Sequence, residues 1–102
     1  MLKKRITDRA KNHLADVKRF TVSQWGQEQA VKYLREIYDK IDLLAQRPQI
    51  GVNRTEELGD GIHSCFIGSH TIYYKHDKKN IVIHAILHQS MTPYSHMRSP
   101  QK

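Results

Sequence analysis

The feature that most constrains the fold is a stripe of apolar residues in the segment 30–44, which recurs at alternating spacings of four and three. Such spacing places all of these side chains on one face of an α-helix. Glu28 near the start and Arg47 near the end have the charges that favour the helix dipole, and Pro48 ends the pattern. The segment therefore predicts an amphipathic helix of about four turns that must pack against a second layer. The stripe consists of Ala30, Leu34, Ile37, Ile41 and Leu44.

A second helical pattern precedes this stripe, and Gly26 separates the two. Thr7 and Asp8 are residues that commonly cap the first turn of a helix. A glycine between two helical patterns is typical of the joint in a helical hairpin, and Trp25 is expected to pack where the hairpin turns. The apolar positions of this first helix are Ala10, Leu14, Val17 and then Phe20 or Thr21.

Short strand patterns flank the hairpin. Residues 2–6 predict one strand before it, and residues 62–67, 70–75 and 81–87 predict three strands after it. Residues 48–61 predict a long loop without regular structure. The expected fold class is α+β, with a helical hairpin packed on a small, mostly antiparallel sheet in the order strand–helix–helix–strand–strand–strand.

The last predicted strand alternates between two faces. Its apolar face is expected to meet the helical hairpin at Ile37, Ile41 and Leu44, whereas His84 and His88 are expected on the opposite face. After this strand, residues 89–102 predict an irregular C-terminal tail of a single domain that spans residues 1–102. The apolar face consists of Ile81, Ile83, Ala85 and Leu87.

The charge of the chain limits its function class. Its 102 residues include 17 Lys and Arg against 10 Asp and Glu, which gives a net charge of +7. This balance excludes an acidic, calcium-binding type of protein and favours an anionic partner, either nucleic acid or an acidic polypeptide. The single cysteine, Cys65, excludes an internal disulfide and indicates a reducing, cytoplasmic setting. No apolar run approaches the ~20 residues of a membrane span, so a soluble protein without a membrane partner is expected.

Few residue patterns suggest metal or covalent chemistry. His84 and His88 would lie about 13 Å apart along one strand, too far to chelate one ion, so no metal and no cofactor is expected. Cys65 has the mid-strand position of an inert thiol, and no nucleophile elbow or phosphate-binding glycine loop is present. Acid–base cleavage of RNA stays open, because His88 with Arg54 and His70 could move a proton beside a phosphate.

Four short motifs resemble the RelE/ParE toxin superfamily of bacterial toxin–antitoxin operons and follow one another in the order found in that family. Together they cover about residues 7–97. The first two lie in and after the helical hairpin. Trp25-Gly26 with Gln29-Ala30, continued by Tyr33-Leu34, resembles the WG-x-x-QA segment of ParE proteins. Leu44-Ala45 with Pro48, Gly51 and Arg54 is similar to LA-x-x-P-x-x-G-x-x-R.

The other two motifs lie in the predicted strands. Gly68-Ser69-His70 with Ile72 and Tyr74 resembles GSH-x-I-x-Y, and Ile86-Leu87-His88 with Met91 resembles ILH-x-x-M, with His96 downstream. The chain departs from the pattern after Met91, where Thr92 stands in place of the usual aspartate.

The resemblance implies a RelE/ParE-like fold and the toxin of a type II toxin–antitoxin system. ParE-type toxins inhibit DNA gyrase by binding and stabilise its cleaved complex with DNA, so that replication stops; such a protein is not an enzyme. The implied partners are DNA gyrase and a ParD-like antitoxin encoded adjacently, which would form a hetero-oligomer with the toxin. Candidate contacts with gyrase combine apolar reach with positive charge: His88, Met91, His96, Met97 and Arg98. Candidate contacts with the antitoxin follow the hairpin: Leu14, Arg19, Trp25, Tyr33 and Tyr38.

Two other functions remain open at this point. One is a ribosome-dependent mRNA endoribonuclease of the RelE branch, in which His88, Arg54 and Tyr94 would be catalytic. Ser64 and His70 argue against that branch, because they are not arginine or lysine at sheet positions where a phosphate clamp is expected. The other is a basic nucleic-acid-binding module, which fits the charge but explains none of the four motifs.

Overall fold

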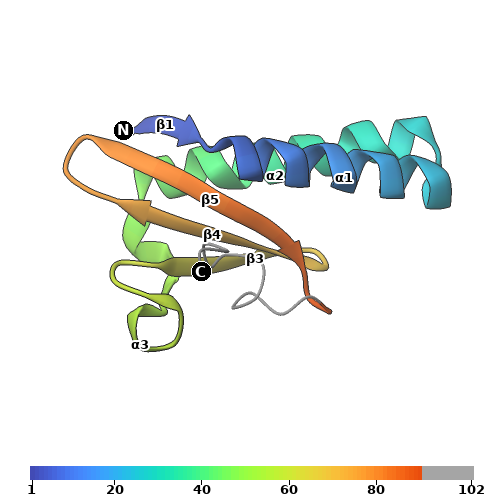
Figure 1. Cartoon of the computed structure of the whole chain (residues 1–102). Helices are drawn as coiled ribbons and strands as arrows, with labels where there is room; N and C mark the ends of the chain where they lie inside the picture. The colour runs from blue at the N-terminus through green and yellow to red at the C-terminus, as the bar shows by residue number, and fades with distance from the viewer. Residues whose placement is uncertain (91–102) are drawn as a thin grey trace.

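The computed structural model describes residues 1–90, and residues 91–102 lie outside the described part. Figure 1 shows a helical hairpin lying along one face of a five-stranded sheet. The strand order is β1-β5-β4-β3-β2, with β1 parallel to β5 and the other neighbours antiparallel. The predicted α+β class and order of elements are thus confirmed. The elements are β1 (Lys3–Ile6), α1 (Asp8–Trp25), α2 (Gln27–Gln46), the 3₁₀ turn η1 (Pro48–Ile50), β2 (Val52–Asn53), α3 (Thr55–Leu58), β3 (His63–Ile67), β4 (His70–His76) and β5 (Asn80–His88).

The helical hairpin forms as its sequence predicts. Thr7 caps α1 by accepting a hydrogen bond from the Ala10 N–H at 3.1 Å, and Gly26 joins the helices with a φ of 95°. On α1 the inward position is Thr21, which is buried, and Phe20 points outward with 55% of its surface exposed. The buried side chains of the two helices include Ala10, Leu14, Val17, Ala30, Ile37, Ile41 and Leu44.

Trp25 does not pack at the turn of the hairpin: 72% of its surface is exposed. Figure 1 shows the physical reason, since the joined ends of α1 and α2 reach past the end of the sheet. No second layer therefore lies beneath the last turn of α1 in the described part of the chain. The prediction of a packed Trp25 is wrong.

The sheet has a core cluster on each face, and a β-bulge in β5 decides which residues of that strand join each cluster. Tyr73 lies opposite Ala85, whereas Tyr74 lies opposite Ile83, so that His84 is an extra residue between them. The extra residue reverses the faces of all later side chains. Ile81, Ile83 and Ile86 consequently pack with the hairpin in one cluster, whereas Ala85 and Leu87 pack with Tyr73 and Ile62 in a second cluster.

The bulge overturns two expectations about β5. Ala85 and Leu87 face away from the hairpin, although the unbroken alternation predicted that they meet it. His88 in turn shares the hairpin side with Ile86 and does not share a face with His84 across a regular strand. The alternation that the sequence predicts holds up to Ile83 and is shifted by one residue beyond His84.

The segment 48–61 is not a structureless loop, which corrects the prediction. It contains η1, the two-residue strand β2 paired with β3, and the single turn of α3. The buried Tyr74 organises its beginning, because its hydroxyl donates to the Pro48 carbonyl at 2.6 Å and accepts the Gly51 N–H at 3.0 Å. A side chain from β4 thus satisfies backbone groups that a solvated loop would leave to water.

Candidate functional site

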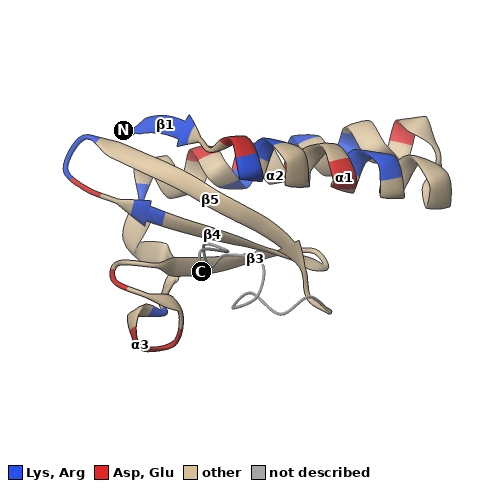
Figure 2. Cartoon of the chain, in the orientation of Figure 1, with Lys and Arg blue, Asp and Glu red and all other residues tan. Residues whose placement is uncertain are grey.

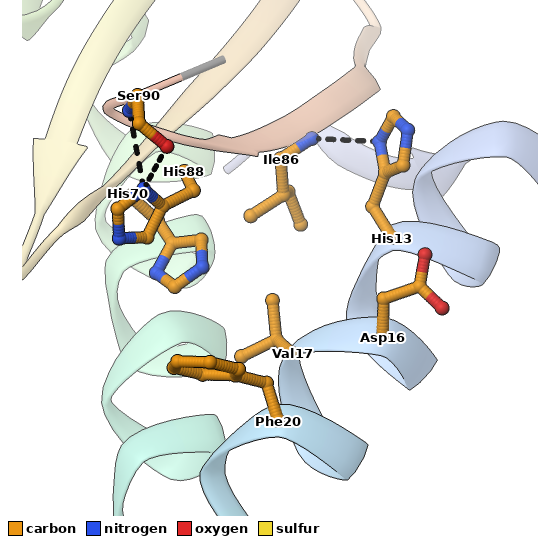
Figure 3. A pocket seen from close by; sticks show the side chains of 8 residues that line it. All are labelled: His13, Asp16, Val17, Phe20, His70, Ile86, His88 and Ser90. Atoms are coloured by element: carbon orange, nitrogen blue, oxygen red, sulfur yellow. Dashed lines mark hydrogen bonds between the residues drawn. The ribbon is translucent and has the colours of Figure 1, made fainter.

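A groove runs between the helical hairpin and the end of β5, and it consists of two adjoining hollows that share Phe20 and His70. Figure 3 shows the first hollow, where side chains from α1 and β5 face one another. We call the two hollows together the aromatic groove. The first, of about 410 Å³, is lined by residues that include His13, Asp16, Phe20, His70, Ile86 and His88. The second, of about 440 Å³, is lined by residues that include Phe20, Trp25, Gln29, Tyr33 and His70.

Phe20 and Trp25 form an exposed edge of this groove. Their exposed fractions are 55% and 72%, which is high for large apolar side chains. Phe20 is exposed because Thr21 takes the inward position on α1, and Trp25 because the hairpin tip extends past the sheet. Exposed aromatic side chains beside hollows are typical of surfaces that bind another protein.

Tyr33 holds the base of the groove to the β3–β4 turn. Its hydroxyl donates to the Ile67 carbonyl at 3.1 Å and lies 2.7 Å from Nδ1 of His70. Both contacts are satisfied when His70 donates its Nδ1 proton to Tyr33. Gly68 permits this arrangement, because its φ is 57° and a Cβ atom there would lie 2.8 Å from a Tyr33 ring carbon.

Two histidines meet at the centre of the groove. His70 and His88 are cross-strand neighbours whose rings lie edge to face with centroids 5.3 Å apart. Nδ1 of His88 accepts the Ser90 N–H at 3.1 Å and lies 2.8 Å from the Ser90 hydroxyl. Burial, and then the neighbouring His88, lower the pKa of His70 below its ordinary value of 6.5. The uncharged form of His70 therefore prevails at neutral pH.

His13 fixes α1 to the part of β5 that β1 does not reach. Its Nδ1 accepts the Ile86 N–H at 3.1 Å, as Figure 3 shows. The Thr7 hydroxyl makes a similar contact with the His84 carbonyl at 3.3 Å. The side chains of His13 and Thr7 thus form hydrogen bonds with backbone groups of β5, and these groups would otherwise be available to pair with a further strand.

The structure does not bring together Arg54 and His88, two members of the set that an endoribonuclease would use. Nε of Arg54 lies 3.5 Å from a carboxylate oxygen of Glu57. Arg54 directly follows β2, which β3 and β4 separate from β5 in the sheet, and its N–H donates to the Ile62 carbonyl at 2.7 Å. His88 is on the hairpin side, and Tyr94, the third member, lies outside the described residues.

The residues proposed to contact an antitoxin have different environments. Trp25 and Tyr38 are exposed, whereas Leu14 is buried in the core and Tyr33 is half-buried. Arg19 is exposed and forms an ion pair with Asp16 one turn before it. Of these residues, Trp25 and Tyr33 line the aromatic groove.

Of the residues proposed to contact gyrase, the structure places only His88, which lines the groove. Met91, His96, Met97 and Arg98 lie outside the described residues. The sequence reasoning missed Phe20 and His13 as groove residues. The helical spacing contained a signal for Phe20, because the choice of Thr21 as the inward position turns Phe20 outward.

Residues 1–90 contain neither a metal-binding cluster nor a membrane-spanning helix. No group of three or more His, Cys, Asp or Glu side chains there could hold a metal ion. In the same part of the chain, no helix has the length and apolar character needed to cross a membrane. Cys65 is partly exposed, and burial raises the pKa of its thiol.

Comparison with known sequences gives one family. Residues 5–93 match the family model described as "ParE toxin of type II toxin-antitoxin system, parDE". Toxin ParE1 of Caulobacter vibrioides is 36% identical over 93 residues, which cover 91% of this chain and 95% of that protein. Toxin ParE1 of Mycobacterium tuberculosis is 33% identical over 87 residues, which cover 84% and 88% respectively.

Solved structures share the fold. A structure of the chromosomal ParDE toxin–antitoxin system from P. aeruginosa superposes with a TM-score of 0.74 at 22% identity, covering 86% of this chain and 96% of that one. The toxin–antitoxin complex RelBE2 from Mycobacterium tuberculosis superposes with a TM-score of 0.65 at 20% identity, covering 85% and 96%. Both likenesses are to chains of similar length, with the same arrangement of hairpin and sheet.

Proposed function

This chain belongs to the ParE toxin family of type II toxin–antitoxin systems, and on that premise we propose that it inhibits DNA gyrase by binding it. The observation that favours a binding function over a catalytic one is the exposure of Phe20 and Trp25 along the aromatic groove, whose other end is lined by His88. A binding inhibitor needs contact area with a few strong anchors, and exposed aromatic side chains are the commonest anchors. It does not need a group that transfers a proton.

The chemistry of the groove supports binding more than catalysis. A ribonuclease needs a proton-transfer group beside a cation that holds the phosphate. His88 is within the groove, but Arg54 follows β2, which β3 and β4 separate from β5. The ring that contacts His88 belongs to His70, whose pKa is lowered by burial and by His88. An uncharged His70 beside apolar side chains suits contact with a protein surface better than contact with a phosphate.

We assign the two protein partners to different parts of this surface. The antitoxin would cover the hairpin side, where Trp25 and Tyr33 line the groove and Arg19 and Tyr38 are exposed. A net charge of +7 would speed the encounter with an acidic antitoxin segment, which would fold on binding and form a hetero-oligomer in the cytoplasm. Gyrase would contact His88 and the residues that follow it: Met91, His96, Met97 and Arg98.

The test is a plasmid cleavage assay with purified gyrase, ATP and this protein. The proposal expects linear, cleaved plasmid to accumulate, and expects the antitoxin encoded next to this chain to prevent it. His88→Gln should give only a partial loss, because one contact among several is removed. The endoribonuclease alternative would replace this proposal if the protein cut ribosome-bound mRNA and the folded His88→Gln variant lost that activity completely.

A further inference from the structure

A basic surface lies on the face of the sheet that the hairpin does not cover, near the start of β5 and away from the aromatic groove. Figure 2 shows Lys and Arg on β1, at the end of β4 and in the turn between β4 and β5. These positions are close in space because β1 and β4 both pair with β5. We define the basic surface as Lys3, Arg5, Lys75, Lys78 and Lys79.

The strand register aligns two of these cations in one row. Arg5 pairs with Val82, and Val82 pairs with Lys75. Neighbouring strands lie about 4.8 Å apart, so the two cationic residues are about 10 Å apart across β5. On β1, Lys4 forms an ion pair with Asp42 of α2, which places Lys4 on the hairpin side and the alternate residues Lys3 and Arg5 on the other side.

His84 lies beside this row on β5. The bulge places it two residues after Val82, the partner of Lys75, and its side chain is half-buried. Burial lowers the pKa of His84, and the positive charges of Lys75 and Arg9 lower it further. The carboxylate of Asp77 serves the adjacent turn, where it accepts the N–H groups of Lys79 and Asn80 at 2.8 Å.

We propose that the basic surface binds the phosphate backbone of duplex DNA without reading its sequence. Like charges gathered on one face repel one another, and a polyanion that binds there relieves the repulsion. The row from Arg5 to Lys75 contains no exposed aromatic side chain on which an unpaired base could stack; its middle residue is the half-buried Val82. The row is formed by neighbouring strands and not by a helix, so its contacts go to phosphates.

The consequence of this contact rests on the proposed function. A toxin that holds both gyrase and the DNA bound to it would leave the cleaved complex more slowly than one that holds gyrase alone. DNA binding itself does not depend on gyrase, and it can be measured in its absence. The failure of one proposal is therefore distinguishable from the failure of the other.

The experiment measures fluorescence anisotropy of a short labelled duplex of arbitrary sequence, titrated with the full chain at several salt concentrations. The expected slope of log K against log salt is about −3.6 to −5.4, as for about four to six phosphate contacts. Arg5→Gln/Lys75→Gln should weaken binding at low salt at least about tenfold and reduce the slope by about 2. Lys32→Gln/Arg35→Gln, on the exposed side of α2, removes the same charge and should change affinity less than about twofold.

Equal losses in both double variants would show a general charge effect and overturn the proposal. A wild-type protein that does not bind the duplex, or that binds an acidic peptide of equal charge more tightly through the same residues, would also overturn it. Circular dichroism checks that the variants are folded. If Arg5→Gln/Lys75→Gln does not fold, Lys78→Gln/Lys79→Gln in the exposed turn tests the same surface, with the same expected loss.

Discussion

Gly51 and Tyr74 are packed so closely that a Cβ atom on residue 51 would overlap the tyrosine hydroxyl group and lie 2.8 Å from the Ser64 carbonyl oxygen. The same hydroxyl bonds to Gly51 and to Pro48, so a buried side chain of β4 fastens the segment after α2 to the sheet. The Pro-x-x-Gly part of the second sequence motif thus has a structural explanation. The spacing of Pro48 and Gly51 lets the Tyr74 hydroxyl group form a hydrogen bond with each of them.

Gly51→Ala should destabilise the fold by about 1–3 kcal/mol, because the added methyl group needs space that Tyr74 and Ser64 occupy. Tyr74→Phe should destabilise it by a similar amount, because the Gly51 N–H and the Pro48 carbonyl lose their partner. The measurement is the free energy of unfolding in urea. The two changes should not add in the double variant, since the phenyl ring relieves part of the overlap; additive losses would contradict this account.

Ile41→Ala should lower the free energy of unfolding by about 2–5 kcal/mol, because Ile41 is 1% exposed and packs between the hairpin and the sheet. Leu43→Ala is the matched control on the same helix. Leu43 is 37% exposed, so its truncation should have a much smaller effect. An equal change in both variants would mean that the stripe does not face the sheet.

Stability should decrease as the pH falls below about 6.5, where the unfolded chain binds protons that His70 and His84 resist. Both pKa values are lowered in the folded state, chiefly by burial, so stability is complete above the ordinary value of 6.5 and is lost as the pH falls toward the lowered values. Urea unfolding at about pH 7.5 and about pH 5.5 measures the difference. His70→Gln should reduce the difference in the free energy of unfolding between the two pH values, although the variant is less stable at both. If the difference stayed as large as in the wild type, groups other than His70 would cause the pH dependence.

Phe20→Ala/Trp25→Ala should weaken the complex with the antitoxin by at least about 2 kcal/mol, or about thirtyfold in Kd. Both side chains are exposed, so the free energy of unfolding should change little. Isothermal titration of each toxin variant with the antitoxin measures the affinity. Val31→Ala, at an exposed position of α2 that does not line the groove, should bind like the wild type. If Val31→Ala lost as much affinity, the groove would not be the antitoxin site.

The hairpin was predictable because its signals are local. The helical period from Ala30 to Leu44, the cap at Thr7 and the break at Gly26 each depend on residues within one or two turns. The bulge at His84 was not, because β5 is apolar on both faces. Ile83 and Ile86 serve one core while Ala85 and Leu87 serve the other, so a shift of one residue leaves no polar side chain misplaced in the pattern.

The aromatic groove could be predicted only in part. Trp25 and His88 are members of the sequence motifs and were predicted as contact residues. The contacts that form the groove, however, join residues that are distant in the sequence. His13 bonds to a residue 73 positions later in the chain, and Tyr33 to one 37 positions later. Helical spacing could turn Phe20 outward but could not place a hollow beneath it, because that depends on where the end of β5 lies.

The pairing of β1 with β5 joins the beginning of the described chain to its end. Lys3 lies opposite Asn80 and Ile6 opposite Ile83, a separation that is long for a protein of this size. During synthesis, residues 3–6 are made before the other described elements, whereas their partner strand is made after the helical hairpin and after β4. The pairing of β1 with β5 must therefore form late. A nascent chain acquires β5 only when synthesis of the described residues is nearly complete. The row from Arg5 to Lys75 and the aromatic groove both need β5, so they form at the same late stage.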